Sequence, residues 1–152
     1  MILVSQPCPC GRRGAAAAPR GVKAFWKSGQ GAPVLGYAEC CGRWHSGPEA
    51  LAAPDAESLM RSRYSAYVLG LADYLLQTWA PQTRPAAIEP DEPGLQWLGL
   101  EIKASRDIDA DHATVSFVAR SKLGGRARRM QECSRFIRGG DGRWLYLDGD
   151  FG

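Results

Sequence analysis

The sequence predicts an α+β protein in which helices pack on one face of an antiparallel sheet. Two observations predict it: a helical pattern follows Pro54, and a series of alternating segments follows from Trp97 to the C-terminus. Helices followed by a run of antiparallel strands are typical of this architecture. A third observation, four cysteines within the first 41 residues, sets the N-terminal part apart from this domain.

The composition is typical of one globular domain with a short appendage. The chain has 152 residues, of which 45% are hydrophobic and 23% charged. The opening stretch, MILVSQPC, is too short for the apolar region of a signal peptide, and no later run reaches the length of a membrane span. We therefore expect a cytoplasmic protein without membrane contact, whose close-set cysteines are metal ligands or redox groups rather than disulfides.

The net charge of +3 is unevenly distributed. Residues 1–50 contain six basic and two acidic residues, whereas the remainder contains 13 basic and 14 acidic residues. The basic character is therefore predicted to belong to the cysteine-bearing part.

Residues 12–36 differ from the rest of the chain. They are rich in glycine and alanine, and carry five basic residues and no acidic one. Phe25, Trp26, Val34 and Leu35 are too few and too scattered to mark a core element. We predict a flexible, mobile insertion, with a short hairpin as the alternative.

Two helices are expected next. After Pro54, one apolar face recurs at helical spacing, with Asp55 as the N-cap and Gly70 as the stop. This face comprises Met60, Tyr64, Tyr67, Val68 and Leu71. The stretch LADYLLQTWAP predicts a second helix ended by Pro81, and residues 81–94, with four prolines, read as a connector.

The remaining sequence predicts strands. In WLGLEIKAS, Leu98, Leu100 and Ile102 alternate with polar or small residues, and ATVSFVARS alternates in the same way. RMQECSRFIR and RWLYLDG follow as two strands, because the GGDG between them is a strong turn signal.

The four early cysteines form two pairs, CPCG and ECCG. Four soft ligands in two pairs suit a tetrahedral structural zinc site, although both spacings are tighter than is usual in zinc fingers. A redox pair is the alternative, but it normally has two intervening residues at a helix N-terminus, and only Pro9 separates Cys8 from Cys10.

The segments CPCG and YAECCGRWHSG resemble a SEC-C motif, a zinc-binding segment also found in the SecA translocation ATPase. Together with LMRSRYSAYVLG, YLLQTW, WLGLEI, SRF and GRWLYLDG, they resemble the YchJ-like family of bacterial proteins. The resemblance implies a SEC-C segment at 1–48 and, at 53–152, a domain of the nuclear transport factor 2-like fold, a curved sheet and helices enclosing a conical pocket. It also implies the zinc ligands Cys8, Cys10, Cys40 and Cys41.

The chain departs from the motif in the length between the cysteine pairs. Twenty-nine residues separate Cys10 from Cys40, where the motif has about eight. The extra loop length costs about 1 kcal/mol of closure entropy, against on the order of 10 kcal/mol from structural zinc binding. We therefore expect the metal site to survive the insertion.

Other residues near the cysteines have alternative readings. His45 could replace Cys41 as the fourth ligand, whereas Cys133 is expected to be a packed or half-exposed thiol. A zinc ion with four thiolates carries a net charge of −2, which the adjacent arginines could balance. The alternative is a surface for RNA phosphates or an acidic protein, and we favour charge balance. These arginines are Arg12, Arg13 and Arg43.

A second candidate site lies in the predicted cone. Alternation places Glu132 and Ser134 on the inner face of the third strand with Met130 and Phe136. We expect a buried Glu132 to pair with Arg61 or Arg63, of which helical spacing favours Arg63, with Tyr64 or Tyr67 as hydrogen-bond donors. Enzymes of this fold use a pocket carboxylate as general base, but a structural ion pair is the favoured reading here.

Two function classes stay open at this point. The favoured one is a zinc-binding interaction or adaptor module, because the SecA segment that it resembles contacts a chaperone and the ribosome. The other is a small-molecule-binding protein or enzyme that uses the conical pocket. The sequence contains no phosphate loop or dinucleotide fingerprint, and with only His45 and His112, catalysis by histidine is not expected.

Overall fold

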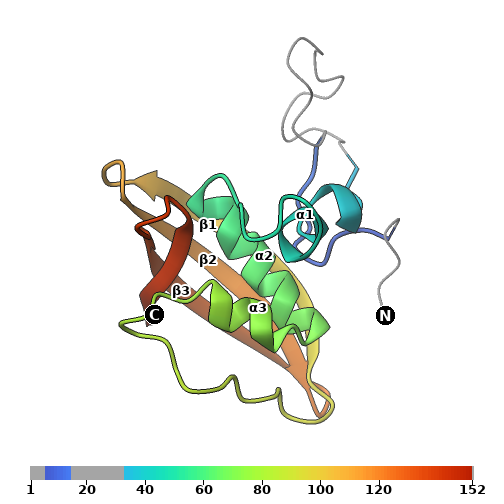
Figure 1. Ribbon diagram of the computed structural model, residues 1–152. Coiled ribbons are helices and arrows are strands. Elements are labelled where there is room, and N and C mark those ends of the chain that lie inside the picture. Colours follow the sequence, from blue (N-terminus) through green and yellow to red (C-terminus); the bar gives the residue numbers. More distant parts are fainter. Residues whose placement is uncertain (1–5, 15–32, 152) are drawn as a thin grey trace.

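The computed structural model describes residues 6–14 and 33–151. Its elements confirm the α+β class, with short helices first and a four-stranded sheet after them (Figure 1). In chain order they are η1 (Tyr37–Glu39), α1 (Gly42–His45), α2 (Ala56–Leu69), α3 (Ala72–Gln77), β1 (Gln96–Asp107), β2 (His112–Leu123), β3 (Arg126–Arg138) and β4 (Trp144–Phe151).

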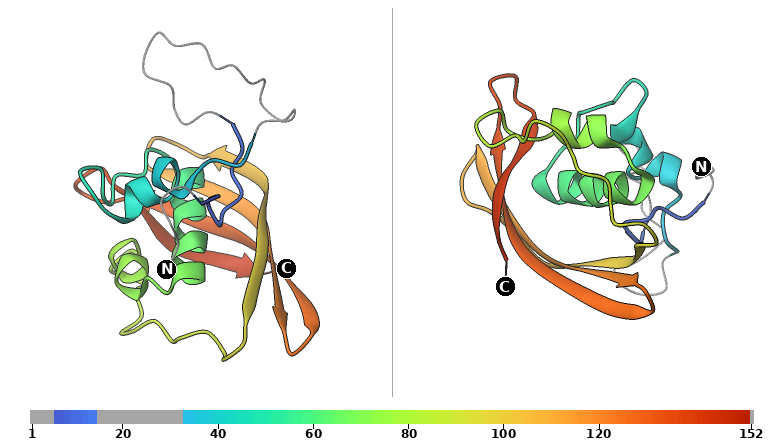
Figure 2. Two further views of the ribbon diagram at one scale, coloured as in Figure 1. Left: turned by 90° about the vertical axis from the view of Figure 1, so that its right-hand side faces the viewer. Right: turned by 90° about the horizontal axis from the view of Figure 1, so that it is seen from below.

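The sheet is an antiparallel meander in the order β1-β2-β3-β4. It curves around α2 and α3, which lie in its concave face, while the N-terminal segment packs on the far side of α2 (Figure 2). The core runs through both parts, because the buried set includes cysteines and Trp44 from the N-terminal segment as well as Leu59, Val115 and Phe136. One continuous core therefore joins the two parts.

Helix α2 has the ends that the sequence predicts. The Asp55 carboxylate accepts a hydrogen bond from the backbone N–H of Ser58 at 2.7 Å, and Gly70 closes the helix in the left-handed conformation, with φ of 72°. Met60 and Tyr64 are buried on the predicted apolar face, and Tyr67 packs beside them.

Helix α2 is also buried on its opposite side, which no apolar pattern predicts. Ser58, Ser62 and Ser65 are buried there: the hydroxyls of Ser58 and Ser65 contact Arg12 and Cys8 of the N-terminal segment, and that of Ser62 contacts Tyr74 of α3. Small polar side chains at these positions allow that segment to approach closely and still find hydrogen-bond partners.

Helix α3 ends at Gln77, earlier than the predicted end at Pro81. The backbone N–H of Tyr146 donates to the carbonyl of Thr78, and the N–H of Ala80 donates to the carbonyl of Tyr146, both at 2.8 Å. Residues 78–80 thus pair with β4 instead of continuing the helix.

The alternation predicted for β1 fails at Leu98. A register shift between Trp97 and Gly99 marks a β-bulge, and Leu98 is 57% exposed. Trp97, Leu100 and Ile102 pack against the core instead.

The insertion is ordered at the ends that the structure describes. Arg13 and Val34 form an antiparallel bridge, as do Pro7 and Gly36, and Leu35 is buried in the core. At residues 12–14 and 33–36, this pairing agrees with the hairpin alternative rather than with an unstructured loop. Residues 15–32, which include Phe25 and Trp26, lie outside the described residues, so the predicted mobility there stays a prediction.

None of the helices within residues 6–14 and 33–151 has the length and apolar character that crossing a membrane requires.

Candidate metal centre and conical pocket

The structure brings the four N-terminal cysteines together. The sulfur atoms of Cys8, Cys10, Cys40 and Cys41, called the cysteine cluster below, all lie within 4.8 Å of one another, and all four residues are buried. The Cys10 and Cys40 sulfurs are 3.6 Å apart. Tetrahedral zinc with Zn–S bonds of about 2.3 Å places its sulfurs roughly 3.8 Å apart, so this donor set fits a four-coordinate metal ion.

Local backbone structure positions each pair. The N–H of Cys8 donates to the carbonyl of Leu35 at 2.8 Å, which ties the first pair to the C-terminal end of the insertion. Cys40 and Cys41 stand between η1 and α1. A Cβ on Gly42 would lie 2.7 Å from the carbonyl oxygen of Tyr37, so this tight connection requires a glycine directly after the pair.

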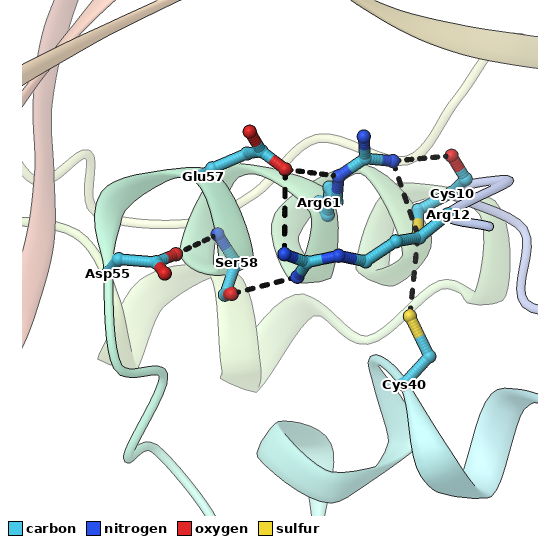
Figure 3. Close-up of polar contacts among 7 residues, drawn as sticks. All are labelled: Cys10, Arg12, Cys40, Asp55, Glu57, Ser58 and Arg61. Carbon is cyan, nitrogen blue, oxygen red and sulfur yellow. Dashed lines mark hydrogen bonds and ion pairs between the residues drawn. The ribbon is translucent and has the colours of Figure 1, made fainter. Parts of the chain in front are cut away.

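Helix α2 supplies a polar contact to the cluster. The Arg61 guanidinium donates to the carbonyl oxygen of Cys10 at 3.2 Å and lies 3.9 Å from its sulfur (Figure 3). Its Nε also donates to Glu57 at 3.0 Å. Burial opposes the charge on Arg61, but Cys10 and Glu57 outweigh this effect and raise the pKa of the guanidinium. A permanent cation therefore stands beside the sulfur atoms.

The flanking arginines are tied to acidic and hydroxyl partners. Arg12 donates to the Ser58 hydroxyl at 3.0 Å and lies 3.7 Å from Glu57, whereas Arg43 pairs with Glu49 at 2.9 Å (Figure 3 shows Arg12). The sequence-based reading of Arg12, Arg13 and Arg43 as the balancing charges overlooked Arg61. The sequence shows that Arg61 is a basic residue on a predicted helix. Its contact with Cys10 depends on how the N-terminal segment packs on α2, which the sequence does not show.

The thiols of the cluster shift one another's pKa in opposite directions. Hydrogen bonding to Cys10, with added effect from burial, raises the pKa of Cys40 and Cys41. Hydrogen bonds from these two thiols lower the pKa of Cys10 in turn. A cation would replace the remaining thiol protons, so metal binding at this site releases protons and weakens as the pH falls.

His45 is not part of the cluster. Its Nε2 lies 2.8 Å from the carbonyl oxygen of Ser62, and its Nδ1 lies 2.6 Å from the Tyr37 hydroxyl. A carbonyl can only accept, so Nε2 carries the proton and Nδ1 accepts from Tyr37. Burial lowers the pKa of His45, which keeps the ring neutral. With both nitrogens engaged, the imidazole joins the N-terminal segment to α2.

Cys133 lies far from the cluster, in β3. It is half-buried and opposite Ser116, on the sheet face away from the helices. This agrees with the expectation of a packed or half-exposed thiol.

A cavity of about 310 Å³ opens between α2 and the concave face of the sheet. It is called the conical pocket below. Aromatic and sulfur-containing side chains dominate its wall, and each predicted pocket residue contributes to it. The wall includes Met60, Arg63, Tyr64, Tyr67, Trp79, Trp97, Phe117, Met130, Glu132, Ser134, Tyr146 and Phe151.

Glu132 is buried in this wall, but its predicted ion pair does not form. Its carboxylate accepts hydrogen bonds from the Ser134 hydroxyl and, at 3.3 Å, from the Tyr146 hydroxyl. No ion pair links it to Arg61 or Arg63 among the described residues. Tyr64 and Tyr67, the expected donors, line the pocket without a hydrogen bond to Glu132.

Arg63 is held by neutral groups instead. Its Nη1 donates to the carbonyl of Leu75 at 2.8 Å and to the Thr78 hydroxyl at 2.7 Å. The guanidinium also lies over the rings of Trp79 and Tyr146, at 4.9 and 4.6 Å from their centroids. Burial lowers the pKa of Arg63. Helical spacing correctly places Arg63 near the sheet. Its hydrogen-bond and ring partners come from α3, the residues after it and β4, and their proximity to Arg63 cannot be predicted from the sequence.

Two contributors to this site were missed from the sequence. Tyr146 bonds Glu132, and burial raises the pKa of its hydroxyl group. Gly149, opposite Ser134 in β4, leaves room for the Glu132 carboxylate, because a Cβ there would lie 2.5 Å from its Oε2. Alternation within WLYLDG assigns Tyr146 to one face of its strand. That its hydroxyl reaches Glu132 depends on the register between β3 and β4, which the sequence does not give.

Comparisons with known proteins agree with this architecture. The sequence profile of a family described as "YchJ, middle NTF2-like domain" matches residues 55–149. A UPF0225 protein from Bordetella pertussis is 60% identical over 114 residues, which cover 75% of this chain and 85% of that protein. A UPF0225 protein from Methylibium petroleiphilum is 54% identical over 144 residues, which cover 95% of this chain and 88% of that protein.

A solved structure extends the similarity to the N-terminal segment. The crystal structure of a SEC-C motif containing protein from Psychrobacter arcticus superposes with a TM-score of 0.71 at 30% identity, and the match covers 97% of this chain and 84% of that one. The predicted resemblance is therefore confirmed: this chain belongs to the YchJ-like, UPF0225 family, with an NTF2-like domain behind its cysteine-bearing segment.

Proposed function

We propose that this protein is a zinc-stabilised interaction module of the cytoplasm, whose N-terminal segment offers a binding surface to a protein partner. The observation that carries the proposal is the cysteine cluster, in which four buried sulfurs lie within 4.8 Å of one another.

The donor set favours zinc in a structural role. Four thiolates suit zinc, and a site that takes all four ligands from the protein leaves no open position for a substrate. In that case the metal does not perform chemistry, but fixes a short segment that cannot build its own core. The segment would then act by binding a partner through its surface.

A groove beside the cluster supports an interaction role. A hollow of about 460 Å³ lies between the N-terminal segment and the start of α2, with Arg43 and Trp44 on one side and Pro54 on the other. Its wall mixes basic, acidic and apolar groups, as protein-binding surfaces do. Loss of the metal would release one wall, so binding would depend on zinc. The SEC-C resemblance suggests a protein partner associated with the ribosome.

Metal analysis tests the first part of the proposal. The purified protein should contain about one zinc ion per chain, and Cys40→Ser should lose most of it because one thiolate of the tetrahedron is gone. Cys133→Ser is the matched control, since Cys133 is a cysteine outside the cluster. Full zinc retention by Cys40→Ser would contradict the assignment.

A pull-down from bacterial lysate tests the second part. We expect Arg43→Glu to lose partners that the wild-type protein retains, because it reverses a charge on the groove wall. Arg143→Glu, in the turn before β4, makes the same charge change away from the groove. If both variants retain the same proteins as the wild type, the groove is not the contact surface.

The conical pocket favours a second candidate function, the binding or conversion of a small molecule. A 310 Å³ cavity with an apolar wall and a few buried polar groups is typical of ligand sites. Trp79 and Trp97 in its wall allow a direct test by tryptophan fluorescence during a screen of small aromatic compounds. A hit whose signal survives Tyr67→Phe and Glu132→Gln unchanged would lie outside the pocket and count against this candidate.

A further inference from the structure

The hairpin of β2 and β3 carries a local concentration of positive charge, although residues 51–152 as a whole have nearly equal numbers of basic and acidic residues. From Arg120 to Arg129 the chain has five basic residues and no acidic one. These residues, called the basic hairpin below, are Arg120, Lys122, Arg126, Arg128 and Arg129. Acidic residues elsewhere cancel them in the total for residues 51–152, so the division of net charge between the two parts of the sequence does not show this local concentration.

The register places two of these cations directly opposite each other. Arg120 of β2 faces Arg129 of β3, and Lys122 lies two residues further toward the turn. Directly opposed residues share a sheet face, so these three lie on the face away from α2 and Glu132. Like charges in this arrangement repel each other unless an anion lies between them.

The other two cations lie on the opposite face of the same hairpin. Arg126 and Arg128 alternate with Arg129, and all five basic residues are exposed. The turn between the strands is Gly124–Gly125, with φ of 57° and 79°, a tight two-residue turn without side chains. The hairpin therefore ends in a narrow tip, with cations on both faces, at one corner of the molecule (Figure 2, orange).

Few acidic groups neutralise this charge. Glu101 lies 3.3 Å from Arg120 but also bonds Lys103, and Glu92 lies 3.7 Å from Arg128, whose side chain is 55% exposed. Among the described residues, the side chains of Lys122 and Arg126 make no hydrogen bond or ion pair. The hairpin is thus available to an external anion.

We propose that the basic hairpin binds the phosphate backbone of double-stranded RNA. Cations spaced along a strand match a regular row of phosphates, and such contacts need no base recognition. No aromatic residue occurs between Val118 and Gln131, so the hairpin lacks the stacking side chains of single-strand binders. Cations on both faces suit the narrow major groove of an A-form helix, where a thin ribbon meets phosphates on two sides. This surface goes beyond the proposed zinc-dependent contact and does not include the groove beside the cysteine cluster.

Fluorescence anisotropy with a labelled RNA duplex of about 20 base pairs tests this proposal. Three to five phosphate contacts predict that affinity falls roughly 40- to 500-fold between 50 and 200 mM salt. The double variant Lys122→Gln with Arg126→Gln should weaken binding about tenfold or more and lower the slope of log affinity against log salt by about 2. Neither side chain makes a hydrogen bond or ion pair within the described structure, and both substitutions leave the backbone pairing of the strands in place, so the fold should be preserved.

The matched control removes the same charge at the other end of the sheet. Arg106→Gln with Arg143→Gln should leave affinity and salt slope nearly unchanged. Equal losses in the two double variants would mean that net charge alone drives binding, and would overturn the proposal. Equal or tighter binding of a DNA duplex of the same sequence, or of poly-glutamate, would overturn the assignment to RNA.

Amide chemical shifts of the wild-type protein give a measurement that needs no variant. Titration with the RNA duplex should shift resonances of residues 120–129 first. Shifts confined to the cysteine-bearing segment would overturn the proposal.

Discussion

Glu132 is a buried carboxylate whose partners are hydroxyl groups. It is 6% exposed and accepts from Ser134 and Tyr146, while Gly149 leaves it space. Hydrogen bonds to a charged acceptor offset part of the desolvation of that charge, but no ion pair adds to them. Removal of Glu132 therefore leaves hydroxyl groups, rather than a buried cation, without a partner.

Substitutions of Glu132 should separate its shape from its charge. Glu132→Gln keeps an oxygen that accepts from Ser134 and Tyr146 and removes the cost of burying a charge, so the melting temperature should stay the same or rise. Glu132→Ala should lower the free energy of unfolding by about 1–3 kcal/mol, because two hydroxyl groups lose their acceptor. Thermal denaturation of both variants decides the point, and a larger loss in the glutamine variant would contradict it.

Helix α2 organises the molecule at the level of elements. One side of it packs on the sheet and closes the conical pocket, and the other side bonds the N-terminal segment through Ser58, Arg61 and the carbonyl of Ser62. Because His45 and Arg61 make these bonds with backbone carbonyls, they hold the segment in one orientation. The position of the cysteine cluster relative to the sheet is therefore set by its contacts with α2.

Arg61 should tune metal affinity from this helix. Arg61→Met removes the cation beside Cys10 and the hydrogen bond to its carbonyl, so zinc affinity should fall by roughly 10- to 100-fold, as for other groups that support metal ligands. Competition with a chromophoric zinc chelator measures it.

Arg12→Met is the control for this prediction. Arg12 bonds Ser58 and Glu57, as Figure 3 shows, but makes no hydrogen bond to a cysteine among the described residues, so its loss removes a similar charge without the ligand contact. An equal fall in affinity for both variants would show that general charge, rather than the Cys10 contact, sets the affinity.

At the scale of the whole molecule, the two parts share one core. Cys8, Leu35 and Trp44 from the N-terminal segment belong to the same buried cluster as Leu59 and Phe136 of the sheet-and-helix domain. A core that crosses both parts favours a single cooperative unfolding transition.

Removal of zinc should therefore destabilise the whole chain. Structural zinc binding contributes on the order of 10 kcal/mol, as much as the entire stability of a typical domain, so chelation should lower the melting temperature by roughly 10 °C or more. Calorimetry with and without chelator, compared with Cys133→Ser treated in the same way, measures this effect. Two separate transitions, with the later one insensitive to chelator, would contradict the shared core.

The sequence by itself determined the class of the fold, the capped ends of α2 and the four cysteines, because these depend on local patterns: periodicity, cap residues and close spacing. It also identified the family, since motifs are local too. Only the tertiary structure decided the partners of Arg61, Arg63 and Glu132. Their contacts depend on strand register, on the early end of α3 and on the packing of the N-terminal segment across α2. The basic residues of the hairpin are visible in the sequence, but only the pairing of β2 with β3 brings Arg120 against Arg129 from nine residues away. Local patterns fix which groups a chain carries, and the relative placement of distant elements fixes which of them meet.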